Sequence, residues 1–526
     1  MQRRSLLGAV GTALLARPGL AQGTRSRTLR FVPQANLTIL DPIQTTAGVS
    51  LDHGYAVFDT LYGTDADFRP TPQMAEAHES SADGLTWSIR LRPGLRFHDG
   101  EPVLARDCAA SLARWSRRDT FGQTLGAAVD AWEAADDRTV RIRLKRPFPR
   151  LLSALAFVGP IPAFIMPERL ARTDPYKAVT EMVGSGPWRF LPDEFVSGSR
   201  VAYARFDGYG PRPEPAVLNG GGKAVHFDRM EWQVIPDAAT AAAALRAGEV
   251  DWWEFADADL VPSLARSRGV TVAPYDPLGF MAFLRFNSHV PPFNNVALKR
   301  AVLAAVDQAQ YMPLVTGGDD TAWHTAYSMF PTGLPFVTEV GAATMGGPKD
   351  LGRLREAVKQ SGYAGEKVVV LSPSDLSSVA PFGDVTADLL KQLGMNVDLQ
   401  VMDWGSVTQR RTSREPVEKG GWSIFHTTWK SASIANPALN TNIRGQGDKG
   451  WFGWFDSPAI ETQTAEWLGA STDAEQQRLF DGIQRTAFEQ VPVVPLGQFV
   501  QKTAYRSDLT GILPGPAAFP WNLRRG

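Results

Sequence analysis

Cysteine is nearly absent from this chain of 526 residues, which contains only Cys108. A single cysteine cannot form an intramolecular disulfide, so the core alone must stabilise the fold. Cys108 lies in "EPVLARDCAASLARW", where Leu104, Cys108, Leu112 and Trp115 recur at helical spacing. This spacing predicts that Cys108 faces the core and is not a nucleophile.

A strong charge imbalance is also missing, because 54 basic residues stand against 55 acidic ones. Without a basic field, the chain is not expected to bind nucleic acid. Its 44% of hydrophobic and 21% of charged residues are typical of a globular protein, and its length exceeds what one core can organise. We therefore expect two to four domains and a monomer.

Motifs of catalysis and of cofactor binding are missing as well. There is no HExxH, no GxSxG and no cysteine pair at metal-ligand spacing, and the seven histidines lie far apart. The segment "NGGGK" (219–223) lacks the GxxxxGK[ST] spacing of a phosphate loop, and we interpret it as a flexible surface loop. We predict a protein that is not an enzyme and has no catalytic residue, no cofactor and no resident metal. The alternative of a different class is a periplasmic hydrolase assembled from distant Ser, His and Asp residues.

No apolar run reaches the length of about 20 residues that a membrane helix needs. The first residues instead combine the pair Arg3-Arg4, a short apolar run at 6–16, and small residues at Gly19 and Ala21. This pattern predicts a signal peptide over 1–21, cleaved after Ala21, and a periplasmic protein. The arginine pair favours the twin-arginine route, with the general route as the alternative. Cleavage would leave 51 basic and 55 acidic residues, a formal charge of −4.

Aromatic residues are plentiful, with 15 Trp, 27 Phe and 10 Tyr, and tryptophan often stacks on ligands. In the first half, "TWSIRL" and "TVRIRL" alternate as half-buried strands on either side of the helix that contains Cys108, which predicts an α+β unit over about 66–180. Further along, "EWQVIPDAATAAAALRAGEVDWW" predicts a strand, a helix capped by Asp237 and stopped by Gly248, and another strand.

A second α/β region begins beyond Asn287. Within it, "KVVVLSPSD" and "NVDLQVMDWG" predict parallel strands on either side of the helix "DVTADLLKQLG", which we expect Asp384 to cap. Ligands in open α/β sheets collect at the carboxyl ends of the strands. This rule predicts a cleft beside the following residues: Ser372, Ser374, Asp375, Asp403 and Trp404.

Several segments, in order along the chain, resemble the family 5 solute-binding proteins of ABC importers, the dipeptide, oligopeptide and nickel-binding group. These segments are "LTILDPIQTTAG", the run from "VFDTLYGTDADFRP" to "DCAASLARW", "GSGPWRF", "ALRAGEVDWW", "FNSHVPPFNNVALKRAVLAAVD" and "EQVPVVPLGQF". The most specific of them is "LRPGLRFHDGEPVLARD". The resemblance covers nearly the whole mature chain.

The resemblance implies an α/β, two-lobed periplasmic-binding-protein fold of the class II, cluster C type. It assigns 24–65, 181–275 and 491–526 to lobe I, with an inserted α+β subdomain at 66–180, and 276–490 to lobe II. It places the crossings between lobes near Phe283–Asn287 and Val493–Leu496. It also implies that the protein captures a small solute between its lobes and delivers it to the transmembrane subunits of an ABC permease.

In the resembling family, ligand contacts come from a loop of the first lobe and from two segments of the second. Carried onto this chain, they predict these contact residues: Thr45, Thr46, Tyr55, Trp404, Trp422, His426, Trp429 and Lys430. Each has a structural alternative, such as Tyr55 packing only against a helix or Trp404 covering the sheet edge. His426 also leaves a metal or metal-chelate carrier open as an alternative function.

The stretch "GGWSIFHTTWKSASIANPALNT" (420–441) contains no carboxylate, and we expect a buried strand at 422–424 followed by a loop. In the family that the chain resembles, the peptide-binding members have a motif similar to W-x-x-D, followed shortly by D-P. The first aspartate of this motif pairs with the ammonium group of the peptide. Here Trp429 matches the tryptophan, but Ala432 stands at the aspartate position and Asn436-Pro437 at the second motif. Since a buried ammonium without a partner costs several kcal/mol, we predict that unmodified di- and tripeptides do not bind unless another carboxylate, such as Asp375 or Asp403, replaces the anchor.

Lys430 is the one fully charged group in this stretch. If its side chain points between the lobes, it favours anionic or hydroxyl-rich ligands and repels an ammonium. The alternative is that it extends outward into solvent.

Overall fold

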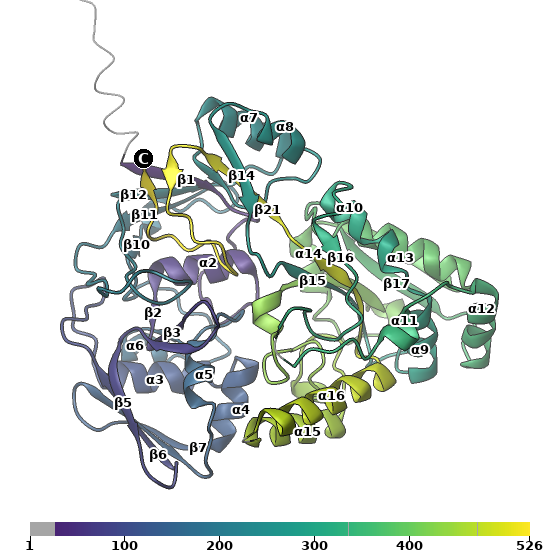
Figure 1. The fold of residues 1–526 in the computed structure, drawn as a ribbon, viewed down its shortest axis with the longest axis horizontal. Helices are drawn as coiled ribbons and strands as arrows, with labels where there is room; N and C mark the ends of the chain where they lie inside the picture. The colour runs from purple at the N-terminus through teal and green to yellow at the C-terminus, as the bar shows by residue number, and fades with distance from the viewer. Residues whose placement is uncertain (1–26, 335, 471) are drawn as a thin grey trace, which may run out of the picture.

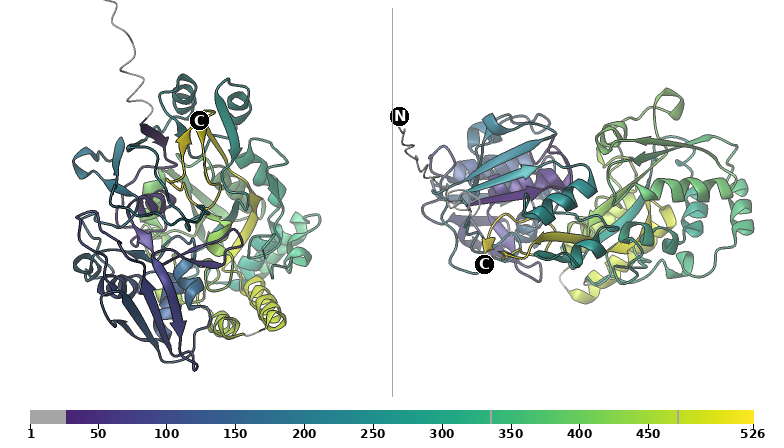
Figure 2. Two further views of the ribbon diagram at one scale, coloured as in Figure 1. Left: turned by 60° about the vertical axis from the view of Figure 1, so that its left-hand side comes forward. Right: turned by 90° about the horizontal axis from the view of Figure 1, so that it is seen from above.

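Two mixed β-sheets, one on each side of the molecule, organise the chain in the computed structural model, which describes residues 27–334, 336–470 and 472–526. Figures 1 and 2 show them as two bodies joined in the middle, with the chain passing from one to the other and back. We call the body around the seven-stranded sheet lobe I and the body around the six-stranded sheet lobe II. The predicted signal peptide, with Arg3, Arg4 and the cleavage site after Ala21, lies outside the described residues.

The sheet of lobe I has the order β10-β11-β12-β1-β13-β21-β14, and β1 runs parallel to β12 and β13. Helix α7 begins and ends where the sequence predicts, since the Asp237 carboxylate accepts from the Thr240 N–H and Gly248 adopts a left-handed conformation with φ of 72°. The strands and helices of this sheet are β1 (Thr28–Val32), α2 (Gly48–Val57), β10 (Trp188–Phe190), β11 (Arg200–Arg205), β12 (Arg229–Gln233), α7 (Ala238–Ala247), β13 (Trp252–Trp253), α8 (Val261–Ala265), β14 (Val270–Pro274) and β21 (Lys502–Arg506).

The first body also contains a four-stranded antiparallel sheet, β5-β6-β8-β7, which lies at the lower left of Figure 1. Its alternating residues are buried as expected, with Ile89 of β6 and Ile142 of β8 fully enclosed, and so is Cys108 of α3. The elements are β5 (Ala75–Ser80), β6 (Thr86–Leu91), α3 (Ala105–Trp115), α4 (Thr120–Ala128), β7 (Val129–Ala134), β8 (Thr139–Leu144), α5 (Leu151–Ala156) and α6 (Glu168–Ala171).

The sheet of lobe II has the order β16-β20-β15-β19-β17-β18, with β17 parallel to both β18 and β19. The apolar strand predicted in "KVVVLSPSD" is confirmed as β17, and the strand predicted in "NVDLQVMDWG" as β18. The elements are β15 (Phe280–Phe286), α9 (Val296–Ala305), α10 (Met312–Thr316), β16 (Trp323–His324), α11 (Ala342–Met345), α12 (Leu351–Gln360), β17 (Lys367–Pro373), α13 (Pro381–Gln392), β18 (Asn396–Met402), α14 (Trp404–Arg410), β19 (Ile424–Lys430), α15 (Pro458–Gly469), α16 (Asp473–Gln490) and β20 (Val493–Phe499).

Short elements complete the described chain. They are the strand pairs β2 (Asp59–Thr60) with β9 (Phe164–Ile165), β3 (Tyr62–Thr64) with β4 (Pro70–Pro72), and β22 (Leu509–Thr510) with β23 (Arg524–Arg525), and the 3₁₀ turns Pro192–Glu194, Gln308–Gln310, Val417–Lys419, Ser431–Ile434 and Gly447–Lys449. None of the helices in the described residues is long and apolar enough to cross a membrane.

The chain crosses between the two sheets at 275–279, from β14 to β15, and again at 500–501, from β20 to β21. The two crossings lie side by side, because the Tyr275 N–H donates to the Gln501 carbonyl at 2.8 Å. The segments that the resemblance names as crossings lie instead in or directly after β15 and within β20. The cause is that β15 and β20 pair along most of their length at the centre of lobe II.

Three local predictions are wrong. The segment 219–223 is not a flexible surface loop, since Asn219 and Lys223 are buried. The strand expected at 422–424 instead begins at Ile424 and continues to Lys430, because β15 pairs with its whole length. Asp384 does not cap α13, which begins one turn earlier at Pro381, a residue whose fixed φ suits the first turn of a helix.

Candidate functional site

The carboxyl end of β19 brings a lysine to the junction of the two lobes. Lys430 is the last residue of β19 and pairs with Phe280, the first residue of β15 after the crossing. Its side chain is 8% exposed, and its Nζ lies 5.4 Å from the centre of the Tyr275 ring. Lys430 therefore does not extend into solvent but turns toward the crossing and lobe I.

Lobe I supplies a pair of buried carboxyl groups to the same place. Asp52 lies in α2 and Glu254 directly follows β13, and both are fully buried. One Asp52 oxygen accepts from the Ala518 N–H at 2.9 Å. The two Glu254 oxygens accept from the backbone N–H and the side-chain amide of Gln34, at 2.8 and 2.7 Å. These donors, which all belong to lobe I, hold both carboxyl groups in place at the junction.

The two carboxyl groups also interact with one another, and a hydrogen bond between them requires a proton on one of them. Burial raises the pKa of Asp52, and the charge of Lys430 opposes that shift. Burial and the neighbouring charge of Asp52 together hold the pKa of Glu254 well above its usual range. The pair therefore resists losing both of its protons.

The crossing adds Tyr275 and Asp276. One Asp276 oxygen accepts from the Leu278 N–H at 3.0 Å, while burial raises the pKa of the carboxyl group to about 6 against the opposing charge of Lys430. We call the residues that meet here the junction cluster; they are Asp52, Glu254, Tyr275, Asp276 and Lys430. The cluster combines groups from both lobes and from the segment that connects them.

Several buried polar atoms at this junction have no hydrogen-bond partner among the described residues. They include Nζ of Lys430, Oδ2 of Asp52, Oδ2 of Asp276 and Oγ of Ser431. Leaving such an atom unsatisfied inside a protein costs about 1–3 kcal/mol. A concentration of them at one place between two lobes is the arrangement expected of a site that a polar solute completes.

The other residues predicted to contact a ligand make their contacts within their own lobes. Tyr55 packs edge-on against Phe164 and Phe519 in lobe I, and the Thr45 hydroxyl accepts from the Ala47 N–H before α2. Thr46, next to it, is half-buried. In lobe II, Nε1 of Trp422 donates to the Ser413 carbonyl at 3.2 Å.

His426 lies between β19 and α13, where its Nε2 and the Thr386 hydroxyl are 2.8 Å apart and burial lowers its pKa to about 3. Among the described residues, no group of three His, Cys, Asp or Glu side chains is arranged to hold a metal ion. Trp404 begins α14, half-buried against the guanidinium of Arg411. Asp403 caps the same helix, and Asp375 accepts from the Trp404 N–H.

Of the predicted residues, Lys430 thus lies at the junction with an unpartnered polar atom. Trp429 lies on the other face of β19, where it packs edge-on against Trp451. Sequence reasoning missed Asp52, Glu254, Tyr275 and Asp276. A usable signal was present, because "DWWEFAD" places a glutamate between tryptophans and a phenylalanine at the end of a predicted strand. A charge embedded in such an apolar run is rarely buried without a function or a partner.

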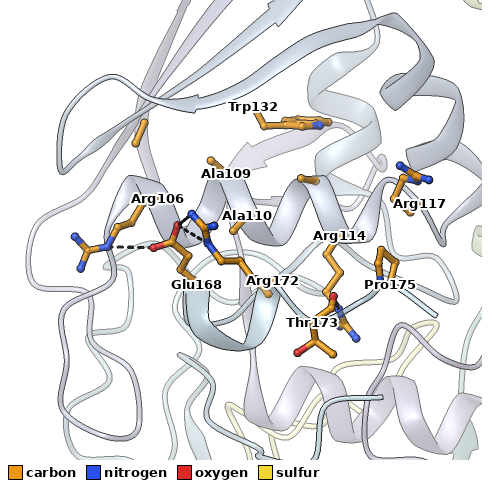
Figure 3. Close-up of a pocket in the computed structure, with 13 residues that line it drawn as sticks. Arg106, Ala109, Ala110, Arg114, Arg117, Trp132, Glu168, Arg172, Thr173 and Pro175 are labelled. Atoms are coloured by element: carbon orange, nitrogen blue, oxygen red, sulfur yellow. Dashed lines mark hydrogen bonds and ion pairs between the residues drawn. The ribbon is translucent and has the colours of Figure 1, made fainter. Parts of the chain in front are cut away.

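A hollow of about 450 Å³ lies beside α3, and no residue of the junction cluster lines it (Figure 3). Ala109, Ala110 and Trp132 form part of its lining. Several of its charged groups pair within the protein, since Arg172 contacts Glu168 at 2.7 Å and Arg114 contacts Asp41 at 2.8 Å. Unlike the junction cluster, these paired charges give no sign of a ligand.

Comparisons with known proteins agree with this architecture. Residues 69–451 match the model of the bacterial extracellular solute-binding proteins, family 5 Middle. A probable peptide ABC transporter periplasmic-binding protein, y4tO of Sinorhizobium fredii, is 35% identical, with 100% of this chain and 99% of that protein covered. The glutathione-binding protein GsiB of Pectobacterium atrosepticum is 26% identical, with 98% and 96% covered.

Solved structures show the same fold. The binding protein AgaA of A. tumefaciens R10, in complex with agropinic acid, superposes with a TM-score of 0.80 at 22% identity, covering 95% of this chain and 99% of that one. DppA of Helicobacter pylori, in complex with the peptide STSA, gives 0.79 at 20% identity, covering 96% and 99%. The comparisons give no support to a metal carrier or a hydrolase. The fold is the two-lobed fold of periplasmic binding proteins, and the chain belongs to the family 5 extracellular solute-binding proteins of bacteria.

Proposed function

We propose that this protein is the periplasmic solute-binding component of a peptide-type ABC importer, which captures a small polar solute between its lobes and delivers it to the transmembrane subunits of the permease. The observation that carries the proposal is the junction cluster, in which Lys430 of lobe II faces Asp52 and Glu254 of lobe I with buried polar atoms left unpartnered. Binding and release require no covalent chemistry.

The two crossings supply the motion that this function needs. They are short, adjacent and joined by the hydrogen bond from Tyr275 to Gln501, so the lobes can rotate about one axis. A solute that contacts both lobes binds the closed form more tightly than the open form. This difference in affinity shifts the protein toward the closed form. The permease then distinguishes loaded from empty protein by the relative position of the lobes.

The ligand is proposed to be a peptide or another small polar solute. The relatives support both, since their names and titles describe a probable peptide transporter component, glutathione binding and a complex with agropinic acid. Ala432 is buried, with 5% exposure, at the position where the resemblance expects an aspartate. Its methyl group offers no counter-charge to an ammonium, so plain di- and tripeptides should bind only if another carboxylate supplies the anchor. Asp276, whose Oδ2 has no partner among the described residues, is one candidate at the junction.

Export is part of the proposal. We infer a signal peptide cleaved after Ala21 and transport by the twin-arginine route, on the sequence pattern alone. Intact-mass analysis of the exported protein tests the cleavage site. Replacing Arg3 and Arg4 by lysine should abolish export, and an unchanged periplasmic yield would assign the protein to the general route.

The decisive experiment measures solute binding together with the radius of gyration of the protein. Purified mature protein is titrated with glutathione, a tripeptide and agropinic acid, and solutes that co-purify with it are identified by mass spectrometry. We expect at least one solute to raise the melting temperature and to reduce the radius of gyration in X-ray scattering. A solute that binds stoichiometrically without compaction would contradict closure of the lobes, and turnover of a bound solute would contradict a pure binding function.

A further inference from the structure

The two lobes meet a second time, away from the crossings. Helices α4 and α5, which accompany the four-stranded sheet of lobe I, lie beside α15 of lobe II in the lower part of Figure 1, whereas β14 and β21, which lead into the crossings, lie in its upper part. Rotation of the lobes about the crossings displaces the groups far from the axis the most. Contacts of α4 and α5 with lobe II therefore break when the lobes open.

A pair of hydroxyl groups forms the first of these contacts. Oγ1 of Thr120, at the start of α4, lies 3.2 Å from Oγ1 of Thr441 in lobe II, so one hydroxyl donates to the other. The Thr441 side chain is buried, with 8% exposure. Water therefore has little access to this hydrogen bond while the lobes are closed.

One turn along α4, a threonine and an arginine form the second contact. The Thr124 hydroxyl donates to the Thr120 carbonyl at 3.1 Å, and so it presents a lone pair to lobe II. Nη1 of Arg444 donates to this hydroxyl at 3.3 Å. Glu461 holds Arg444 in place, because its two carboxylate oxygens accept from Nε and Nη2 at 2.8 and 2.6 Å. Each side of the contact is therefore fixed within its own lobe.

Two further contacts extend this region. The Ser433 hydroxyl donates to the Val158 carbonyl at 3.3 Å, and both residues are buried. The guanidinium of Arg150, directly before α5, lies 4.7 Å from the centre of the Trp467 ring in α15. We call these four contacts between the lobes the seam. Ser433 follows Lys430 by three residues, so the seam begins near the junction cluster.

Resting on the proposed function, we propose that the seam is a latch, which stabilises the closed form of the empty protein and sets the fraction of protein that is closed before a solute binds. The apparent dissociation constant of a solute is its intrinsic constant for the closed form divided by this fraction. The latch therefore changes the affinity for every solute by the same factor. The junction cluster selects the solute, whereas the latch sets the common scale of affinity.

The first test needs no solute. In the mature protein, Thr124→Val removes the acceptor for Arg444 and keeps the shape of the side chain, so the open form should become more populated. We expect the radius of gyration of the ligand-free variant in X-ray scattering to exceed that of the wild type. Thr486→Val is the matched control, because the Thr486 hydroxyl of α16 also donates to a carbonyl four residues earlier, that of Gly482 at 3.0 Å, but to no group of lobe I in the described residues.

The second test traps the closed form. Because the two hydroxyl oxygens are 3.2 Å apart, the double variant Thr120→Cys with Thr441→Cys should form a disulfide between the lobes when it is oxidised with copper phenanthroline in air. The native Cys108 is fully buried and does not compete. We expect the oxidised variant to have a smaller radius of gyration than the same variant reduced with dithiothreitol.

The third test asks whether the latch acts equally on different solutes. Glutathione, a tripeptide and agropinic acid are titrated by calorimetry into the wild type and the variants. For each solute that binds the wild type, Thr124→Val should weaken the apparent affinity by the same factor, on the order of 2- to 10-fold, which corresponds to one hydrogen bond. Thr441→Val, which removes a contact from the side of lobe II, should act in the same way, and Thr486→Val should change nothing.

Each outcome decides the proposal. Thr124→Val with the radius of gyration of Thr486→Val, no disulfide between positions 120 and 441, or a loss of affinity that differs among the solutes would overturn the latch. If a solute still compacts the wild type, the proposed function stands and this inference alone fails. If no solute compacts either the wild type or the more open Thr124→Val, the seam is a static contact and both fail.

Discussion

Two buried lysines, Lys223 in lobe I and Lys430 at the junction, have opposite surroundings. Lys223 donates to Asp59 at 2.7 Å and lies 4.7 Å from the centre of the Trp521 ring. Asp59 in turn accepts from the Tyr209 hydroxyl at 2.9 Å. Lys430 is similarly buried, yet its Nζ has no hydrogen-bond partner among the described residues. The difference teaches that a buried lysine with an ion-pair partner, such as Lys223, does not by itself indicate a binding site. A buried lysine whose Nζ lacks a hydrogen-bond partner, such as Lys430, does indicate one.

The largest effect should follow from breaking the paired lysine. Lys223→Met leaves Asp59 buried without its cation, so we expect a loss of about 3–5 kcal/mol in the free energy of unfolding. Urea unfolding at pH 7 measures it. Asp59→Asn combined with Lys223→Met should recover part of the loss, because the uncompensated charge is removed; a double variant no better than the single one would contradict this account.

The next effect concerns the crossing itself. Gly279 has φ of 65°, and a Cβ there would lie 2.3 Å from the Phe499 carbonyl oxygen, so Gly279→Ala must shift backbone of the neighbouring crossing. We expect a loss of about 2–4 kcal/mol, together with a changed radius of gyration.

The control is Gly248→Ala at the end of α7, where φ is 72° and a Cβ would meet nothing within 4 Å. It should cost only about 1 kcal/mol and leave the radius of gyration unchanged. Equal losses for the two variants would show that the crossing tolerates displacement.

A third effect tests a buried neutral group that belongs to the fold of lobe II. The pKa of His426 is lowered to about 3 by burial, whereas an unfolded chain binds the proton near pH 6.5. Stability from this residue is therefore present above pH 6.5 and is lost as the pH falls toward 3. When the pH falls below 6.5, the free energy of unfolding of His426→Gln should therefore decrease less than that of the wild type. The difference should be about 1.4 kcal/mol per pH unit. Urea unfolding at pH 7 and 5 checks this, and parallel losses in both proteins would disprove it.

The smallest effect should come from the unpaired lysine. Lys430→Met removes no hydrogen bond, and the buried carboxyl groups near Lys430 have raised pKa values and can take up a proton when its charge is deleted. The free energy of unfolding should therefore stay within about 1 kcal/mol of the wild type. Differential scanning calorimetry of ligand-free protein measures this. A loss as large as that of Lys223→Met would mean that Lys430 is a structural residue like Lys223, and the contrast between them would disappear.

Local sequence patterns predicted much of the fold. Helix α7 is specified by Asp237 and Gly248 within one short segment, and strand β17 by a continuous apolar run, so both predictions are confirmed. The segment 219–223 was misread because its burial depends on distant partners. Asn219 accepts from Thr64, and Lys223 pairs with Asp59, and neither contact leaves a trace in local composition.

The candidate site could be predicted only in part, for the same reason. The aromatic stretch around Trp429 and Lys430 is visible in the sequence, and Lys430 ends β19 beside the crossing. The rule that ligands collect at the carboxyl ends of strands was applied to the residues after β17 and β18, and that use of it stays a prediction. The carboxyl groups opposite come from α2 and from the end of β13, far apart in the chain. Their meeting depends on lobe packing, which no motif encodes.

The position of β21 has a consequence for folding during synthesis. This strand, formed by Lys502–Arg506 near the end of the chain, lies between β13 and β14 inside the sheet of lobe I. While the ribosome is still adding the last residues, the sheet that begins with β1 therefore has a gap between two of its strands. Lobe I can complete its sheet only after residues 502–506 have been made, so a chain truncated before residue 502 should remain sensitive to proteases at β13 and β14.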